Sequence, residues 1–390
     1  MTLIACTVTK NIPFLIGDIL FSSKAGREIM QLPTNNFDIN VYLPKNTTTK
    51  PDSLSQKIYI IRDNLCIILA GLEAEMKDLL VSFKKWCNIY FASEVINETH
   101  IIEFFEHYDF QSSFLKSHFG IILVDRVDDN LLNTKFITNN GWGLLNTDIF
   151  DDVHACGSGQ ESFLSIVKEL GNFKSGLNKE DLMSIIQSNI SLVAKILTLE
   201  KITLHTLMDH WGAGFETVFY NNDRFEKMDK IAYIISVGDF DDEGNIGVPI
   251  PRSILYYQYH NDILFITAIE VLKSKKVNYE DKIIITSILG EYDVNLHIVP
   301  SIERVDILSD SDYPADYSFN TFKISMGYCL LHNKINPFYP SYFSFHPEAT
   351  VAYEHGKSIE IKIPKVYNDD IAMNSKNEFI NTMKGHTEGK

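Results

Sequence analysis

Blocks of strand-type sequence alternate with blocks of helix-type sequence along the first 236 residues. Two short apolar segments rich in Ile, Leu, Val and Thr, residues 2–9 and 14–22, are separated by the turn sequence Asn11-Ile12-Pro13 and predict a β-hairpin. The segments KIYIIRDN and LCIILAG predict a second hairpin that turns at residues 62–64. From Leu72 the apolar spacing becomes helical, and a second helical pattern follows at THIIEFFEHY.

The same alternation continues after the two predicted helices. HFGIILVDR and TKFITN predict strands, and HACGSGQESFLSIVKEL changes from a strand to a helix, with Ser158 and Glu161 in the spacing of a capping box. A long helical pattern at about 179–207 precedes GFETVFYN and KIAYIIS, which predict a further hairpin. This order of elements predicts an α+β fold in which two stacked sheets are covered by helices on the outside.

Composition and charge narrow the class of protein. The 390 residues are 45% hydrophobic and carry a formal charge of −16, so the chain can bury a large core but lacks the clustered Lys and Arg of a nucleic-acid surface. We expect no leader peptide and no membrane span, because no apolar run approaches about 20 residues. The five scattered cysteines predict buried free thiols in a reducing compartment, and we expect a cytoplasmic protein.

Six residues that are far apart in the chain are candidates for a catalytic site. Thr2 opens the first strand, Asp18 follows in the second strand, and Lys57 begins the third, with Gly71 lying 14 positions after Lys57. Ser158 lies in a Gly-Ser-Gly turn between a strand and a helix, and Asp209 precedes the segment WGAGFETVFYN. In this order and context, residues 2–236 resemble the proteasome-type N-terminal-nucleophile (Ntn) hydrolases, especially bacterial forms that start with Met-Thr.

The resemblance implies a four-layer αββα sandwich and the activity of a threonine peptidase or amidase. After removal of Met1, the hydroxyl of Thr2 would be the nucleophile and its own α-amine, with a pKa of about 7.7–8.0, the base. Asp18 would hold Lys57 charged, and Lys57 would lower the cost of forming the alkoxide. The backbone N–H of Gly71, at the N-terminus of a helix, would bind the oxyanion.

Further roles follow from the same resemblance. Ser158 and Asp209 would orient the α-amine, whereas Gly212 stands where the family has a serine, so the proton network is one hydroxyl short. Ser22, Tyr59 and Leu69 would line the substrate pocket, and the last two favour an apolar side chain. The expected partners are a peptide or unfolded protein as substrate, further copies of the chain in a homo-oligomer, and an ATP-dependent unfoldase. The alternative is a catalytically inactive relative that uses the scaffold for assembly or binding.

Two segments lie outside this scheme. Residues 27–55 are polar and contain three prolines, so they predict a loop without a role in the core, and their anchor points beside Asp18 and Lys57 predict a cover over the active site. Residues 237–390 predict a C-terminal α/β extension of mixed strands with one or two helices and a mobile polar tail. The sequence assigns no chemistry to this extension.

No metal site and no cofactor are expected. The acidic segment 239–245 resembles the front of a calcium loop, but Ile250 stands where the closing glutamate is needed, so we interpret it as a hairpin turn. The twelve histidines form no HExxH motif, and Gly141-Trp142-Gly143 is too short to hold a phosphate.

Overall fold

The structure is a computed structural model, and it describes most of the first 304 residues and five short strand segments after them. The described ranges are 2–24, 26, 30–35, 43, 49–92, 96–108, 117–128, 131–139, 141–171, 182–239, 250–272, 276–280, 283–288, 292–304, 322–324, 327–332, 342–344, 349–354 and 358–364. The polar tail that was predicted at the C-terminus lies outside them, as do residues 240–245 of the acidic segment.

The first sheet contains the N-terminal hairpin at its centre. Its six strands, in spatial order, are β12 (Arg224–Lys227), β11 (Phe215–Asn221), β2 (Ile12–Asp18), β1 (Leu3–Thr9), β10 (Asp152–Gly157) and β9 (Gly143–Leu145). All neighbouring strands are antiparallel. The β1–β2 turn is made by Lys10 and Asn11, both with positive φ, as in the type I′ turns that suit hairpins.

The second sheet lies over the first. Its strands, in order, are β5 (Ile58–Arg62), β6 (Leu65–Ala70), β7 (His118–Asp128) and β8 (Leu131–Thr138). Alternate side chains of β5 and β6 point to opposite faces, so Ile58 and Ile68 pack against Ile4 and Leu15 of the first sheet in one buried cluster. The two sheets therefore share an apolar interface.

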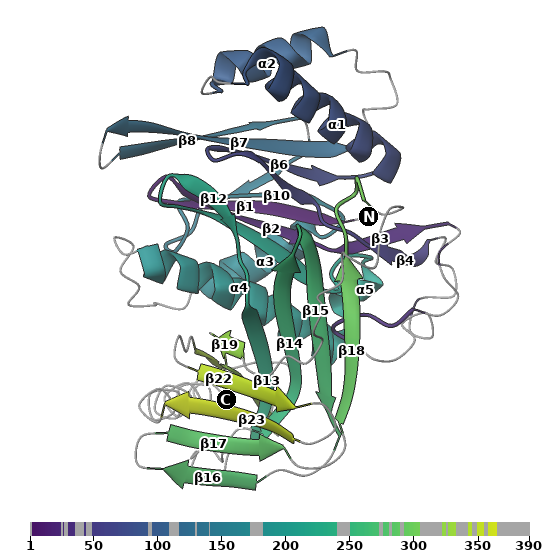
Figure 1. The fold of residues 1–390 in the computed structure, drawn as a ribbon, viewed down its shortest axis with the longest axis vertical. Helices are drawn as coiled ribbons and strands as arrows, with labels where there is room; N and C mark the ends of the chain where they lie inside the picture. Colours follow the sequence, from purple (N-terminus) through teal and green to yellow (C-terminus); the bar gives the residue numbers. More distant parts are fainter. Residues whose placement is uncertain are drawn as a thin grey trace, which may run out of the picture.

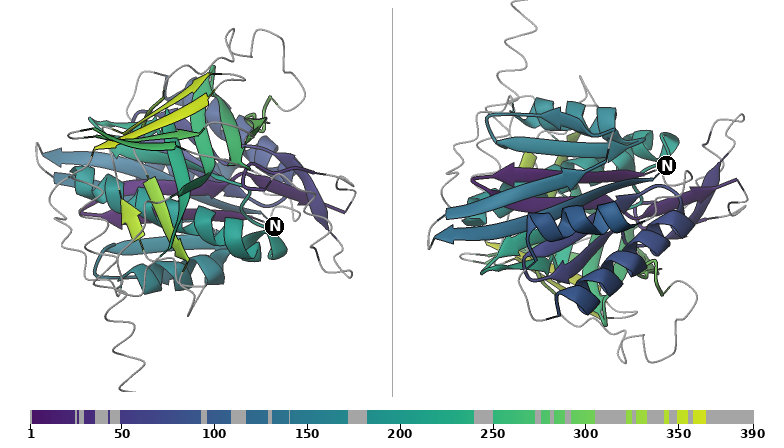
Figure 2. Two further views of the ribbon diagram at one scale, coloured as in Figure 1. Left: turned by 90° about the horizontal axis from the view of Figure 1, so that it is seen from below. Right: turned by 90° about the horizontal axis from the view of Figure 1, so that it is seen from above.

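Helices cover the outer faces of both sheets (Figures 1 and 2). Helices α1 (Glu73–Tyr90) and α2 (Glu98–His107) pack on the second sheet, where Met76, Phe83 and Phe104 meet the outward side chains of β5, β6 and β7. Helices α3 (Gln160–Gly171) and α4 (Leu182–Thr203) pack on the first sheet. The short α5 (His205–Met208) follows α4 after Leu204, whose φ of 56° ends α4 and divides the single long helix that the sequence predicted.

Three further sheets complete the described structure. Strands β3 (Leu20–Ser23) and β4 (Lys50–Leu54) form a ribbon. A six-stranded sheet runs β18 (Tyr292–Val299), β15 (Ile263–Val271), β14 (Ile250–His260), β13 (Ile231–Asp239), β20 (Gly327–His332) and β21 (Tyr342–Ser344). A five-stranded sheet runs β16 (Lys276–Glu280), β17 (Ile283–Ile288), β23 (Ser358–Pro364), β22 (Ala349–Glu354) and β19 (Phe322–Ile324). Within these sheets only the pair β13 and β20 is parallel among the described strands.

The structure corrects one prediction about the C-terminal half. GFETVFYN and KIAYIIS do not form one hairpin, because β11 pairs with β12 and β13 pairs with β14 in a different sheet. Every helix or strand described after residue 237 is a strand, and the predicted one or two helices of the extension stay a prediction. The predicted boundary at residue 236 falls inside β13, and Tyr233, Leu255 and Tyr257 share one buried cluster with Leu3 and Phe14.

The prediction that residues 27–55 form a loop outside the core is also wrong in part. Met30 and Leu32 belong to the largest buried cluster, and Thr34 and Asn35 are fully buried. Strand β4 pairs with β3 at the end of the segment. Much of the remainder lies outside the described residues, so the predicted cover over the active site stays a prediction.

The described cysteines agree with their predicted state. Cys6, Cys66, Cys87 and Cys156 are free and buried. Among the described helices, none combines the length and the apolar character that crossing a membrane requires.

Candidate functional site

Asp18 is the centre of a buried polar cluster at one end of the first sheet. It is the last residue of β2 and is fully buried. Its Oδ1 accepts hydrogen bonds from Thr2 Oγ1 at 2.6 Å, from the Leu3 N–H at 2.8 Å and from Lys57 Nζ. Its Oδ2 accepts the N–H of Gly212 at 2.9 Å. Four donors therefore point at this carboxyl group. A carboxylate has only acceptor atoms, so this environment suits its ionised form.

Lys57 reaches the cluster from the second sheet. It immediately precedes β5, and its side chain is fully buried, with Nζ also donating to the Leu20 carbonyl at 2.8 Å. Burial lowers the pKa of Lys57, and the attraction of Asp18 opposes this shift. Since Thr2 Oγ1 and Lys57 Nζ bond to the same oxygen of Asp18, the hydroxyl and the amine are held next to each other.

Ser158 contacts the backbone of Thr2. Strands β1 and β10 pair with Leu3 opposite Gly157, which places the residue after β10 beside the residue before β1. The Thr2 N–H donates to Ser158 Oγ at 3.1 Å, and the Thr2 carbonyl accepts the Gly159 N–H at 3.3 Å. The helix α3 begins at Gln160, one residue later than the capping-box spacing predicted, so the hydroxyl of Ser158 serves Thr2 instead of capping the helix.

Gly212 supplies a backbone donor where the sequence predicted only a missing hydroxyl. Its φ is +110°, a conformation that side chains disfavour, and this conformation aims its N–H at Asp18. Asp209 lies three residues earlier, at the C-terminus of α5. Its side chain is 46% exposed, and its described polar contact is with the His205 ring, 3.6 Å away. The predicted role of Asp209 in orienting the amine stays a prediction.

Glu200 lies behind Gly212 and was missed by the sequence analysis. It is fully buried in α4, where its carboxylate accepts hydrogen bonds from Thr34 Oγ1, from Thr206 Oγ1 at 2.5 Å and from the Ala213 N–H at 3.0 Å. Burial raises the pKa of Glu200 to about 7, although these hydrogen bonds lower it. The available signal was the one carboxylate in SLVAKILTLEKIT, a helix segment in which most of the remaining residues are apolar.

Glu216 is a second buried carboxylate that the sequence analysis missed. It lies in β11, and its Oε1 accepts the N–H of Lys57 and the N–H of Ile58, the latter at 2.8 Å. Burial raises the pKa of Glu216 to about 7. The side chain therefore fixes the start of β5, which carries Lys57, against the first sheet.

Gly71 connects β6 to α1, as the sequence predicted. Its φ is +135°, and a Cβ atom there would contact Ser117, whose hydroxyl accepts the next backbone N–H, that of Leu72, at 3.1 Å. Ala70 and Ile4 lie in the same buried cluster, so the end of β6 packs on the start of β1. The role of Gly71 as an oxyanion donor stays a prediction.

Two of the three predicted pocket residues share one buried cluster, and the third belongs to a different sheet. Leu69 is buried against α1 and α2, and Tyr59 belongs to the same cluster, with its hydroxyl donating to the Gln56 carbonyl. Ser22 lies in β3, and its Oγ is buried without a hydrogen-bond partner among the described residues. Their predicted part in substrate specificity stays a prediction.

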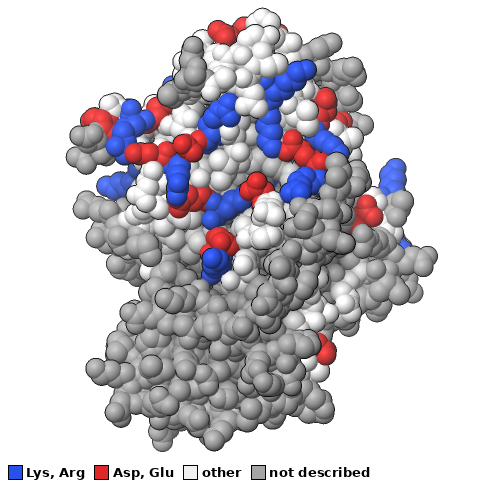
Figure 3. Space-filling model, in the orientation of Figure 1, with Lys and Arg blue, Asp and Glu red and all other residues white. Residues whose placement is uncertain are grey.

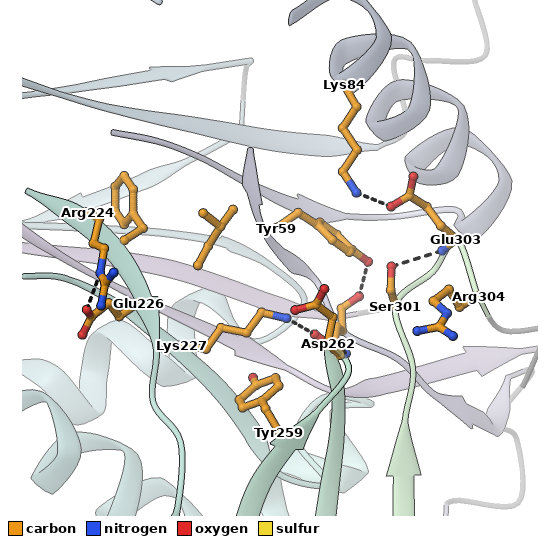
Figure 4. A pocket seen from close by; sticks show the side chains of 13 residues that line it. Tyr59, Lys84, Arg224, Glu226, Lys227, Tyr259, Asp262, Ser301, Glu303 and Arg304 are labelled. Carbon is orange, nitrogen blue, oxygen red and sulfur yellow. Dashed lines mark hydrogen bonds and ion pairs between the residues drawn. The ribbon is translucent and has the colours of Figure 1, made fainter. Parts of the chain in front are cut away.

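A cavity of about 700 Å³ opens near Gln56, the residue before Lys57 (Figure 4). Its described lining comes from β5, α1, β12, the β14–β15 turn and residues 301–304. Among the described residues, no group of three or more His, Cys, Asp or Glu side chains lies close enough to hold a metal ion.

The comparisons with known proteins assign no relatives. No protein-family model matches the chain, and no curated protein matches it.

Proposed function

We propose that the chain is a proteasome-type Ntn hydrolase, a threonine peptidase or amidase that uses Thr2 after removal of Met1. The observation that carries this proposal is the shared oxygen of Asp18, which accepts both Thr2 Oγ1 and Lys57 Nζ in a fully buried position. The proposal includes a four-layer αββα sandwich. It is supported by the apolar interface between the two sheets and by the helices that pack on their outer faces.

In the proposed reaction, Thr2 Oγ1 attacks the carbonyl carbon of a peptide or amide bond, and its proton passes to the freed α-amine. The amine then protonates the leaving nitrogen, and the acyl group remains on Thr2 as an ester until water hydrolyses it. The buried cation of Lys57 lowers the cost of the alkoxide, and Asp18 holds the cation in place. Ser158 Oγ, 3.1 Å from the Thr2 nitrogen, orients the amine.

The oxyanion needs donors of its own. We assign the backbone N–H of Gly71 to this role, together with the N-terminus of α1, which starts at Glu73. The contacts between β6 and β1, which share a buried cluster through Ala70 and Ile4, support this assignment, because they bring β6 to the strand that follows Thr2.

A second candidate is a catalytically inactive scaffold or binding protein. It is favoured by Gly212, which stands in place of a serine with Glu200 directly behind it, and by Asp209, which lies half-exposed beside His205. Under this alternative, Thr2 keeps its structural hydrogen bonds but never forms an acyl ester.

The proposal extends to an intracellular, cytoplasmic homo-oligomer that degrades peptides or unfolded proteins delivered by an ATP-dependent unfoldase. An oligomer is supported by large apolar side chains that α1 exposes, among them Val81, Ile89 and Tyr90. Light scattering after size-exclusion chromatography tests the assembly, and a monomer at micromolar concentration contradicts this part of the proposal.

Two measurements distinguish the hydrolase from the inactive scaffold. Intact mass spectrometry shows whether Met1 is removed, and a peptide electrophile directed at N-terminal threonine shows whether Thr2 is reactive. The hydrolase predicts one adduct per chain, mapped to Thr2 and absent from the heat-unfolded protein. A chain that lacks Met1, is folded and forms no adduct is the inactive scaffold.

A further inference from the structure

The cavity beside Gln56 is built from parts of the chain that are far apart in sequence. Tyr59 and Ile60 come from β5, Phe225 and Lys227 from β12, and Tyr259 from β14. Residues 301–304 close the opposite side, where Tyr59 Oη accepts the Ile302 N–H at 3.3 Å. The hydrogen bond between Tyr59 and Ile302 and the ion pair between Lys84 and Glu303 join different segments of the lining, and Figure 4 shows the labelled side chains around the cavity.

Lys227 is the cation at the inner wall of the cavity. Its Nζ donates to Gln56 Oε1 at 2.6 Å and lies 4.6 Å from the centre of the Tyr259 ring. An ammonium group carries three donors, and the one described hydrogen bond uses one of them. Burial lowers the pKa of Lys227, and the attraction of Glu216 and Asp262 opposes this shift. An anion in the cavity would accept hydrogen bonds from the remaining donors.

The rim of the cavity argues against a ligand with several negative charges. Arg224 is paired with Glu226 at 2.6 Å, and Lys84 is paired with Glu303, so these two rim cations are already compensated. Asp262 adds an exposed carboxylate to the lining. On the face shown in Figure 3, basic side chains lie next to acidic ones. Lys227 attracts a ligand that carries a single negative charge. Additional negative charges on the ligand would lie near the rim carboxylates and be repelled by them.

The walls favour an aromatic or apolar body beside that charge. Tyr59, Phe225 and Tyr259 present ring surfaces, which supply large contact areas to a small ligand. The hydroxyl of Tyr259 is buried and has no hydrogen-bond partner among the described residues, so this residue offers a second donor, on a ring whose centre lies 4.6 Å from the ammonium of Lys227.

We infer that this cavity binds a monocarboxylate with an apolar or aromatic body, of the kind that the C-terminal residue of a peptide presents. Lys227 and the hydroxyl of Tyr259 bind the carboxylate, and the three aromatic rings hold the body. The inference does not depend on the proposed hydrolase activity, because none of its residues belongs to the cluster around Asp18.

The test uses the full chain and two small probes, N-acetyl-phenylalanine and its uncharged amide. By isothermal titration calorimetry or ligand-observed NMR, the acid is expected to bind at least tenfold more tightly than the amide. Lys227→Met should abolish this preference. Lys85→Met, which removes one exposed charge from α1 outside the cavity, should leave it unchanged.

The outcomes divide clearly. Equal binding of acid and amide, binding of neither, or an unchanged preference in Lys227→Met overturns the inference. Tighter binding of inorganic phosphate than of the acid overturns the assignment to a monoanion. If Lys227→Met fails to fold, as judged by circular dichroism, Tyr259→Phe decides, because it removes only a hydroxyl and should weaken binding of the acid severalfold without affecting the amide.

Discussion

The carboxylate of Glu200 occupies the space that a Cβ atom on Gly212 would need. A Cβ built there would overlap Glu200 Oε2 and approach Glu200 Cδ to 2.9 Å and Thr206 Oγ1 to 3.1 Å. The same turn sends the Gly212 N–H to Asp18 and the Ala213 N–H to Glu200. The buried carboxylate of Glu200 therefore requires a residue without a side chain at position 212, which explains why a glycine and not a serine stands there.

The first prediction is that Gly212→Ser destabilises the protein instead of completing the predicted proton network. The positive φ alone costs about 1–3 kcal/mol for a residue with a side chain, and the overlap with Glu200 adds to it. Urea unfolding followed by circular dichroism measures the change. In a Glu200→Ala background the same substitution should cost about 0.5–3 kcal/mol less, because the two positions are in contact. Additive effects would contradict the proposed coupling.

The second prediction concerns the pair of Asp18 and Lys57. Asp18→Asn leaves the Lys57 ammonium buried without a counter-charge, so the free energy of unfolding should fall by about 3–5 kcal/mol. The exposed pair of Arg126 and Asp223 is the matched control, and Asp223→Asn should cost less than about 1 kcal/mol. Urea unfolding of both variants at neutral pH makes the comparison. Equal costs would show that the buried charge is compensated by other means.

The third prediction is a pH dependence of stability that is caused by Glu200. Its pKa is about 7 in the folded chain, above the ordinary value of 4.5. The folded state thus binds the proton more tightly, and stability is highest below pH 4.5 and is lost as the pH rises towards 7. Glu200→Gln cannot ionise, so its stability relative to the wild type should improve by roughly 2–3 kcal/mol between pH 4.5 and pH 8.

Urea unfolding at several pH values measures this relative change. The exposed Glu106→Gln is the control, and its stability difference from the wild type should stay constant between pH 4.5 and pH 8. Parallel curves for Glu200→Gln and wild type would show that Glu200 titrates at the same pH in the folded and unfolded chains.

The fourth prediction tests the proposed nucleophile. Thr2→Ala should abolish hydrolysis of fluorogenic peptides while the fold is retained, because the substitution removes only one hydroxyl and one methyl group from a buried residue. Thr2→Ser keeps a hydroxyl and should retain part of the activity. Lys57→Ala should also abolish the activity. Activity in a pure, correctly processed Thr2→Ala protein would exclude the mechanism, whatever the effect of the other variants.

Three of the site residues that were predicted from the sequence lie at the ends of strands, whereas the two site residues that were missed lie inside a helix or a strand. Thr2, Asp18 and Lys57 stand at the ends of apolar strands, and the resemblance to the proteasome-type hydrolases predicted their roles from that order. The three side chains do meet in the structure. Glu200 and Glu216 lie inside elements and are buried by partners from other parts of the chain, so no local pattern shows what compensates them.

Local patterns also could not assign strands to sheets. The segments of β11 and β13 look alike and are close in the sequence, yet β11 pairs with β2 and β12, whereas β13 pairs with β14 and β20. Apolar alternation tells which face of a strand is buried but not against which strand it pairs. The same holds for Met30 and Leu32, two apolar residues in a polar segment that the core nevertheless takes up.

The sequence by itself determined the mixed α+β class, the N-terminal hairpins and the helices that follow them, because these depend on apolar periodicity and turn residues within short windows. Only the tertiary structure decided which polar groups became partners. It turned Gly212 from a missing hydroxyl into a backbone donor to Asp18, and it placed Glu200 behind that glycine. The physical reason is that a buried polar group is stable only beside its hydrogen-bond partners, and those partners lie far away along the chain.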